Sequence, residues 1–221
     1  MHKPRALITC GPSITPIDAV RRITNFSTGA LGVHLAECLA EYGWQVTCLK
    51  GSAATHRHPE GPHIAVREFT TNHDLAALLA SEPEPEHVSA VFHAAALADY
   101  EVSSVRTLEG ELLEARKISS RHPGLELTLT PAPKLLPKLS TLFPRAHIVG
   151  WKFELEGDTH SALEKGRTQL SENHSALCII NGHAFGEGFG LLNPEGTLQT
   201  LPTRAALCVR LAEWAGTLVA E

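Results

Sequence analysis

Short apolar runs alternate along most of the chain with segments in which apolar residues recur every three or four positions. The runs predict strands at 5–10, 45–49, 64–69, 88–96, 125–129, 147–153 and 176–180. The periodic segments predict helices at 28–42, 72–79, 133–139, 161–170 and 203–218. This alternation is typical of βαβ units, so we expect an α/β, Rossmann-like fold in one domain over 1–221, with a mostly parallel sheet and helices on both faces.

Two segments depart from this alternation. Residues 189–192 and 198–201 predict a small antiparallel hairpin around a turn at 193–196. The stretch 100–124 is long and weakly periodic, and loops of this length usually carry function or are disordered. We therefore expect a mobile loop there.

The segment 8–32, ITCGPSITPIDAVRRITNFSTGALG, is a strand that opens into a loop rich in glycine and hydroxyl side chains before a helix. Backbone N–H groups and a helix N-terminus in such a loop can bind an anion. An ordinary connection in which Ser27 or Thr28 caps the helix explains the same residues, and Asn72 is the expected cap of the second helix. In a parallel sheet, the loops after Cys10 and Ala96 should converge on one crevice.

Composition narrows the function classes. The 221 residues carry a formal net charge of -5, which argues against a general nucleic-acid binder. No apolar run approaches the roughly 20 residues of a membrane span, and the N-terminus does not resemble a signal peptide. We expect a cytoplasmic protein that binds neither nucleic acid nor membrane.

Cysteine and histidine content predicts no metal centre. The five cysteines are odd in number and show no CxxC spacing, so we expect reduced core residues. His56, His58 and His63 cluster in a Pro- and Gly-rich segment that lacks the other ligands of a metal site. That segment is expected to be a solvated loop.

Six motifs occur in one order: the 8–32 segment, HAAALADY, ARKISS, APKLL, VGWKFEL and IIN. Their order resembles the phosphopantothenate–cysteine ligase family, also called the DNA/pantothenate metabolism flavoprotein C-terminal domain. The resemblance implies a stand-alone ligase that joins 4′-phosphopantothenate to L-cysteine through an acyl-nucleotidylate in coenzyme A biosynthesis. It also implies CTP or ATP as co-substrate, Mg²⁺ carried by the triphosphate, and a homodimer for which the late hairpin is a candidate contact.

The resemblance also assigns residues by motif. The implied catalytic residues are Asn25, which holds the acyl-nucleotidylate, Asp99, and Lys117, which promotes activation from the mobile loop. The implied substrate-binding residues are Arg21, Asn25 and Ala96. The implied nucleotide-binding residues are Gly11, Ser13, Ser27, Thr28, Ala95, Ala96, Asp99, Lys117, Trp151 and Lys152. No residue is assigned to a metal.

Some positions depart from the family pattern. Residues 11–13 read Gly-Pro-Ser in place of Gly-Gly-Thr, and Pro12 removes one backbone donor. Ala30 replaces a basic or long residue, and Asn173 stands near a position where a lysine is expected, with Lys165 nearby. These departures motivate one alternative, a non-catalytic nucleotide-binding relative.

The second alternative is an NAD(P)-dependent Rossmann oxidoreductase. It requires a GxGxxG turn after the first strand and an acidic residue at the end of the second strand. The chain has GPSITP and Leu49-Lys50 at these places. The oxidoreductase alternative is therefore the weaker one.

Overall fold

The computed structural model describes residues 3–218 and contains one large, mostly parallel sheet. Its strands are β1 (Arg5–Cys10), β4 (Gln45–Gly51), β5 (Ile64–Phe69), β6 (Val88–His93), β9 (His147–Phe153), β10 (Leu177–Asn181), β11 (Phe189–Leu192) and β12 (Leu198–Leu201). They lie in the order β12-β11-β10-β9-β6-β1-β4-β5. The strands from β10 to β5 in this order pair in parallel, and β11 and β12 pair antiparallel at one edge.

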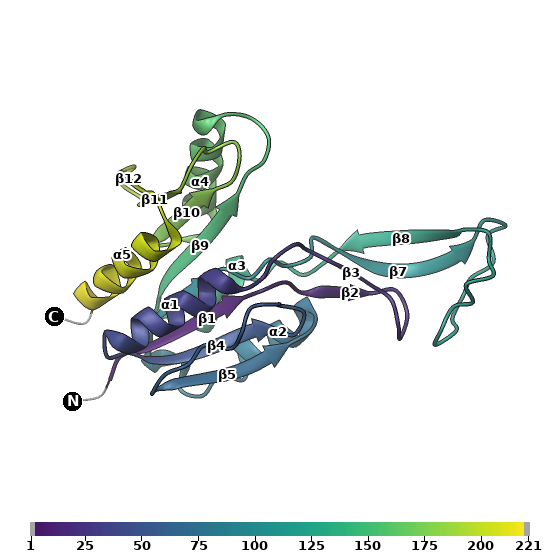
Figure 1. Ribbon diagram of the computed structural model, residues 1–221, viewed down its shortest axis with the longest axis horizontal. Helices are drawn as coiled ribbons and strands as arrows, with labels where there is room; N and C mark the ends of the chain where they lie inside the picture. The colour runs from purple at the N-terminus through teal and green to yellow at the C-terminus, as the bar shows by residue number, and fades with distance from the viewer. Residues whose placement is uncertain (1–2, 219–221) are drawn as a thin grey trace.

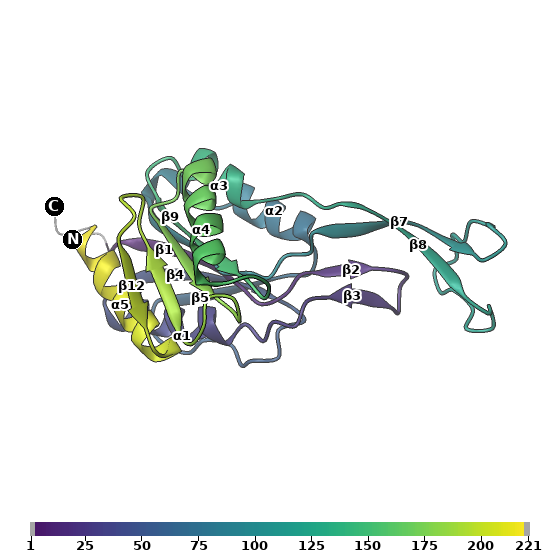
Figure 2. The same ribbon diagram turned by 90° about the horizontal axis from the view of Figure 1, so that it is seen from above.

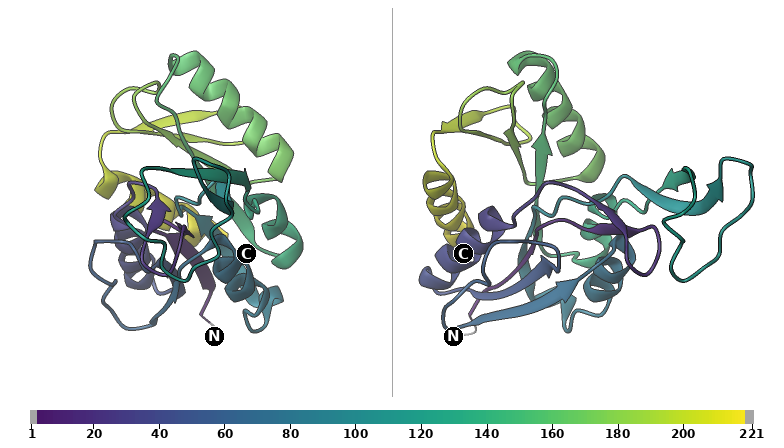
Figure 3. Two further views of the ribbon diagram at one scale, coloured as in Figure 1. Left: turned by 90° about the vertical axis from the view of Figure 1, so that its right-hand side faces the viewer. Right: turned by 45° about the vertical axis from the view of Figure 1, so that its right-hand side comes forward.

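Helices cover both faces of this sheet (Figure 3). One face carries α1 (Ala30–Glu41) and α5 (Arg204–Thr217), and the other carries α2 (Asn72–Ala80), α3 (Leu136–Leu142) and α4 (Thr159–Asn173). Adjacent strand residues point to opposite faces. Ile8 therefore packs in the core beneath α1 and α5, whereas Leu7 packs in the core beneath α2 and α3. The predicted fold class is confirmed.

Most predicted strands match the structure closely. Those at 5–10, 64–69 and 147–153 are confirmed residue for residue, as are both strands of the late hairpin. The run at 88–96 forms a strand only as far as His93, because the chain beyond it leaves the sheet to pair with the loop after β1. Among residues 3–218, no helix is long and apolar enough to cross a membrane.

The predicted helix caps are wrong. The N-cap of α1 is Gly29, at φ 78°, and no side chain caps it. The N-cap of α2 is Thr71, which forms a capping box with Asp74. Asn72 instead donates two hydrogen bonds to backbone carbonyls of later loops, so its amide is used for tertiary contact.

The sequence pattern missed two antiparallel ribbons, although it correctly predicted a strand at 125–129 in one of them. The hairpin β2 (Ile14–Pro16) and β3 (Arg22–Thr24) follows β1, and the arm β7 (Tyr100–Thr107) and β8 (Leu125–Pro131) follows β6. Both ribbons project from the same end of the sheet, away from the chain termini (Figures 1 and 2). The prediction of a structureless loop over 100–124 is thus wrong for β7. Exposure of the arm and a register shift within β7 obscure its alternation.

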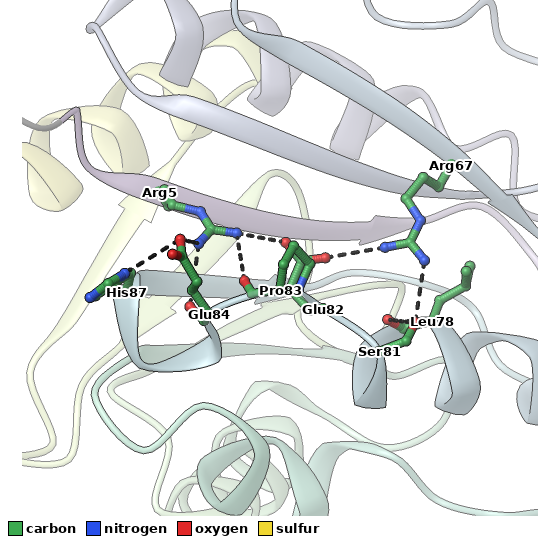
Figure 4. A network of polar contacts seen from close by, with 8 residues as sticks. All are labelled: Arg5, Arg67, Leu78, Ser81, Glu82, Pro83, Glu84 and His87. Carbon is green, nitrogen blue, oxygen red and sulfur yellow. Dashed lines mark hydrogen bonds and ion pairs between the residues drawn. The ribbon is translucent and has the colours of Figure 1, made fainter.

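A cluster of ion pairs fastens the connection between α2 and β6 (Figure 4). The carboxylate of Glu82, with its side chain 3% exposed, accepts from Arg5 at 2.9 Å and from Arg67 at 3.3 Å. Arg5 also donates to the carbonyl of Pro83, just before the short 3₁₀ turn η1 (Pro85–His87). The buried carboxylate is therefore paired on both oxygens, as burial of a charge requires.

We expect Gly32→Ala to destabilise the protein by about 2 kcal/mol, the cost typical of overpacking a core. A Cβ on Gly32 would lie 2.3 Å from the Cβ of Cys10, because α1 packs directly on β1 at this point. The control is Gly216→Ala in α5, where an added Cβ meets nothing within 4 Å. That variant should be neutral or slightly more stable, since alanine is the better helix former. Urea unfolding of both variants checks this, and equal stability would contradict the packing argument.

Candidate functional site

The loops that follow β1 and β6 remain paired after their strands end. Pro12 and Ala96 form an isolated parallel bridge. The Ala96 N–H donates to the Gly11 carbonyl at 2.9 Å, and the Ser13 N–H donates to the Ala96 carbonyl at 3.2 Å. We call this contact between residues 11–13 and 95–98 the loop joint. The predicted convergence of the two loops is confirmed, and it occurs where the strand order reverses.

Asn25 ties the hairpin β2–β3 to the loop joint. Its Nδ2 donates to the carbonyl of Ala96 at 3.1 Å and to the carbonyl of Leu97 at 3.0 Å. Asp99 lies two residues further along the same loop. The structure therefore brings Asn25 to Ala96 and Leu97, and the Oδ1 of Asn25 is left as the group that can meet a ligand.

Gly11 and Ser13 shape the loop joint from inside. Gly11 has φ 78°, and a Cβ there would lie 2.7 Å from the Cβ of Ala54. Ser13 is fully buried, and its Oγ accepts from the Ala98 N–H at 2.8 Å. The polar groups of Ser13 thus hold the protein loop, and its assignment to the nucleotide stays a prediction.

A cavity of about 420 Å³ opens at the carboxyl ends of β6 and β9, between the loop joint and helices α3 and α4. Four of the residues assigned by resemblance line it: Ala95, Asp99, Trp151 and Lys152. The indole N–H of Trp151 is buried and has no hydrogen-bond partner in the part of the chain that the structure describes. The N–H of Ala95 is engaged by Thr9, so only its carbonyl is open to a ligand.

Ionised side chains surround the mouth of this cavity. Lys134 lies 3.8 Å from Asp99, and both side chains are 76% exposed. Lys152 lies 3.3 Å from Glu154, and Lys165 of α4 pairs with the same carboxylate. Burial favours a raised pKa for Glu154, but hydrogen bonds from Lys165 and Lys152 outweigh it and lower that pKa. The lysines therefore share one counter-charge and remain available to an anion.

The helix start after β3 is not part of this cavity. Ser27 donates its N–H to the Asn25 carbonyl, and Thr28 accepts the N–H of Ala30 on its Oγ1. Neither residue lines the cavity among the residues described. Their assignment to the nucleotide stays a prediction.

Lys117 and Arg21 form a separate group at the far end of the arm. The Asp18 carboxylate accepts the N–H of Ile118 at 3.2 Å, and Arg21 donates to the Ile118 carbonyl at 2.7 Å. Hydrogen bonds from the Val20 and Arg21 N–H groups are the main causes that lower the pKa of Asp18. The Ile118 side chain is buried, whereas that of Lys117 is exposed. The segment around Lys117 is therefore docked on the β2–β3 turn and does not line the cavity in its own chain.

His93, the last residue of β6, is a polar residue of the cavity that the sequence pattern did not indicate. The residue is 8% exposed and lines the cavity, and its Nδ1 lies 2.8 Å from the Oγ1 of Thr9. Burial lowers the pKa of His93 to about 4, so the imidazole is neutral at physiological pH. A polar residue at the carboxyl end of a central parallel strand was the available signal.

Comparison with known proteins identifies the domain type. Residues 1–205 match the family model described as the DNA/pantothenate metabolism flavoprotein C-terminal domain. The "Coenzyme A biosynthesis bifunctional protein CoaBC" of Thermococcus kodakarensis is 30% identical over 177 residues, which cover 80% of this chain and 41% of that protein. The chain thus spans about two fifths of the length of the curated relatives it matches first.

Solved structures share the fold. The crystal structure of the DNA/pantothenate metabolism flavoprotein from Streptococcus pneumoniae superposes with a TM-score of 0.85 at 25% identity, covering 96% of this chain and 98% of that one. A Cab2 mutant in complex with phosphopantothenate-cysteine superposes with a TM-score of 0.71 at 20% identity, covering 98% and 87%. At 20% identity, the similarity to the Cab2 structure shows a shared fold and no more.

We expect His93→Gln to reduce the loss of stability on acidification. Between pH 6.5 and about pH 4, the unfolded chain takes a proton on His93 that the folded chain refuses, so the free energy of unfolding falls as pH falls. The full pKa shift of His93 corresponds to a loss of roughly 3 kcal/mol in the free energy of unfolding at low pH. Above pH 6.5 both states are unprotonated at His93, so this loss is absent. Urea unfolding at several pH values measures the difference. Other acid-sensitive groups are common to both proteins and cancel, so equal slopes would contradict the assignment.

Proposed function

Because the chain belongs to the family of the DNA/pantothenate metabolism flavoprotein C-terminal domain, we propose that it is a phosphopantothenate–cysteine ligase of coenzyme A biosynthesis. It joins the carboxylate of 4′-phosphopantothenate to the amine of L-cysteine through an acyl-nucleotidylate. The observation that carries the proposal is the family match over residues 1–205. Support comes from a relative named for coenzyme A biosynthesis and from a fold neighbour bound to phosphopantothenate-cysteine. A cytoplasmic location goes with it, since a free thiol substrate requires a reducing compartment.

The cavity suits the nucleotide. Its walls combine apolar side chains with a few polar groups, as small-molecule sites do, and lysines stand at its mouth. Attack of a carboxylate on the α-phosphate needs charge neutralisation and alignment more than a protein nucleophile. Lys152 and Lys165 supply positive charge for the triphosphate of CTP or ATP, and Trp151 lies beside the base.

Mg²⁺ fits this arrangement as a substrate-borne ion. Among residues 3–218, no group of three potential metal ligands is brought together. Mg²⁺ commonly keeps its waters and binds through phosphates with one or two carboxylates. Asp99 at the cavity mouth is the carboxylate placed to assist, and the ion would neutralise charge on the triphosphate.

The loop joint suits the acyl-nucleotidylate. Asn25 is held on two carbonyls, so its Oδ1 has a fixed position beside Ala96 and Asp99. A rigid polar group of this kind orients an intermediate without contributing charge. Arg21 and Lys117 lie near the end of the arm and do not line the cavity of their own chain, so an arm contributed by a second chain is the way that we propose for them to reach a site.

We therefore propose a homodimer formed through the arm. The arm and the β2–β3 hairpin expose apolar side chains, among them Ile23 at 42%, Phe26 at 112% and Leu129 at 45%. A two-stranded ribbon without a covering layer is only marginally stable in water. A second copy covers these side chains and brings its Lys117 to the partner's cavity. The hairpin β11–β12 at the sheet edge remains the other candidate contact.

The function is tested by a single-turnover quench with phosphopantothenate, cysteine and CTP or ATP. The wild-type protein should release pyrophosphate and then form phosphopantothenoylcysteine. Lys117→Gln removes a cation from the activating loop and should slow pyrophosphate release by about 10²–10³-fold. Asn25→Asp removes the amide donor and adds negative charge, so activation should persist while the intermediate accumulates.

Three outcomes would contradict these assignments. Wild-type protein that binds nucleotide without releasing pyrophosphate would be a non-catalytic relative. Lys117→Gln that releases pyrophosphate at the wild-type rate would remove Lys117 from activation. Normal product formation by Asn25→Asp would remove Asn25 from transfer, and thermal melting of both variants controls for misfolding.

We expect Leu127→Glu to convert the dimer to a monomer. Leu127 is 39% exposed on β8, and a carboxylate there would be buried without a partner in the dimer. Val209→Glu is the control, since Val209 is similarly exposed, at 40%, on α5 far from the arm. Sedimentation equilibrium distinguishes the two. A Leu127→Glu protein that stays dimeric would favour contact through β11–β12.

A further inference from the structure

Thr9 and His93 form a buried polar pair under the cavity. They are aligned neighbours on the parallel strands β1 and β6, and Thr9 is fully buried. The Thr9 Oγ1 lies 2.8 Å from the His93 Nδ1 and also accepts the N–H of Ala95 at 3.3 Å. The pair thus links the strand ends to the loop joint, and no role in the proposed reaction has been assigned to it.

These contacts determine which imidazole nitrogen carries the proton. Thr9 Oγ1 accepts the Ala95 N–H, and a buried hydroxyl hydrogen also needs an acceptor of its own. His93 Nδ1 is the acceptor within reach. Nδ1 is therefore unprotonated and Nε2 carries the hydrogen. Among the described residues Nε2 has no hydrogen-bond partner, although His93 lines the cavity.

The surroundings of His93 are polar but uncharged. Gly150 is its aligned neighbour on β9, and a Cβ on Gly150 would lie 2.4 Å from the amide nitrogen of Gln169, so this amide packs over the strand beside His93. Asn173 lines the same part of the cavity and is 9% exposed. The lysines, by contrast, keep their side chains 35–76% exposed. The cavity therefore has a neutral floor, whereas ionised side chains of both signs, the lysines with Asp99, Glu154 and Glu172, lie around its mouth.

We infer that His93 determines nucleotide specificity by donating its Nε2–H to an acceptor atom on the edge of the nucleobase, while the lysines at the mouth meet the triphosphate. The inference rests on the proposed function for the identity of the ligand. A base is a neutral ring with donor and acceptor atoms on its edge, and it matches the neutral floor. A phosphate would instead favour the charged mouth.

Thr9 is the positioning residue for this donor. It holds the imidazole in one tautomer and one orientation, as second-layer partners of histidine generally do. Thr9→Val preserves the shape but removes the hydroxyl. His93 should then exchange between tautomers and present a donor to the base for only part of the time.

Nucleotide binding without the acid substrate tests the inference. Isothermal titration with CTP and ATP should show affinity for the preferred nucleotide weakened about tenfold in His93→Phe, the loss expected for one hydrogen bond to a buried group. Binding of magnesium tripolyphosphate, which has no base, should be unchanged. His147→Phe, on the opposite end of β9, is the matched control and should bind both ligands as the wild type does.

Nitrogen NMR of the wild-type protein tests the tautomer directly. The ¹⁵N shifts of His93 should show a protonated Nε2 and an unprotonated Nδ1, and Thr9→Val should mix the two states. The inference is overturned if Nδ1 carries the proton, if His93→Phe keeps wild-type nucleotide affinity, or if it weakens tripolyphosphate equally. Pyrophosphate release plays no part in these readouts. A protein that lacks ligase activity but shows His93-dependent nucleotide binding would therefore refute only the proposed function.

Discussion

The loop joint is the constraint on which the rest of the site depends. In a sheet of this topology, the chains leaving the two central strands normally separate and open a crevice for a ligand. Here they stay hydrogen-bonded through Gly11, Ser13 and Ala96. The joint closes the bottom of the crevice, anchors Asn25, and sets the direction in which both ribbons leave the sheet. Replacement of a residue inside it would shift groups on both sides of the site together.

The deep part of the cavity is lined by neutral groups, whereas the ionised side chains lie near its mouth. His93 at the floor is buried and stays neutral, because removal from water disfavours its charged form. Lys152 and Lys165 at the mouth stay in contact with water and share the carboxylate of Glu154. A nucleotide has the same division between a neutral base and an anionic triphosphate. In the binding mode that we propose, the base meets the neutral floor and the triphosphate meets the lysines at the mouth.

The arm β7–β8 carries Lys117, a proposed catalytic residue, away from the main sheet and its helices. Asp18 and Arg21 hold the backbone of Ile118, and the Ala19 N–H donates to the Arg116 carbonyl, so the exposed Lys117 lies between two anchored residues at the end of a ribbon. The apolar side chains along the ribbon lack cover in one chain. In the dimer that we propose, association brings Lys117 to the site of the partner chain and also buries the apolar surface of the ribbon.

The sequence by itself determined the sheet and the family, whereas the tertiary structure decided the ribbons, the caps and the floor of the cavity. Strands such as β1 and β9 are buried on both faces, so burial leaves an apolar run that can be read locally. The alternation in β8 predicted a strand, but β7 is interrupted by a register shift, so their pairing into a ribbon could not be read from the sequence. Thr71 rather than Asn72 caps α2, because Asn72 is drawn to carbonyls of distant loops. His93 gained its hydrogen-bond partner Thr9 only through the pairing of distant strands in the sheet. Hydrophobic periodicity reports how each segment meets the core, but hydrogen bonds between distant segments exist only once the chain has folded.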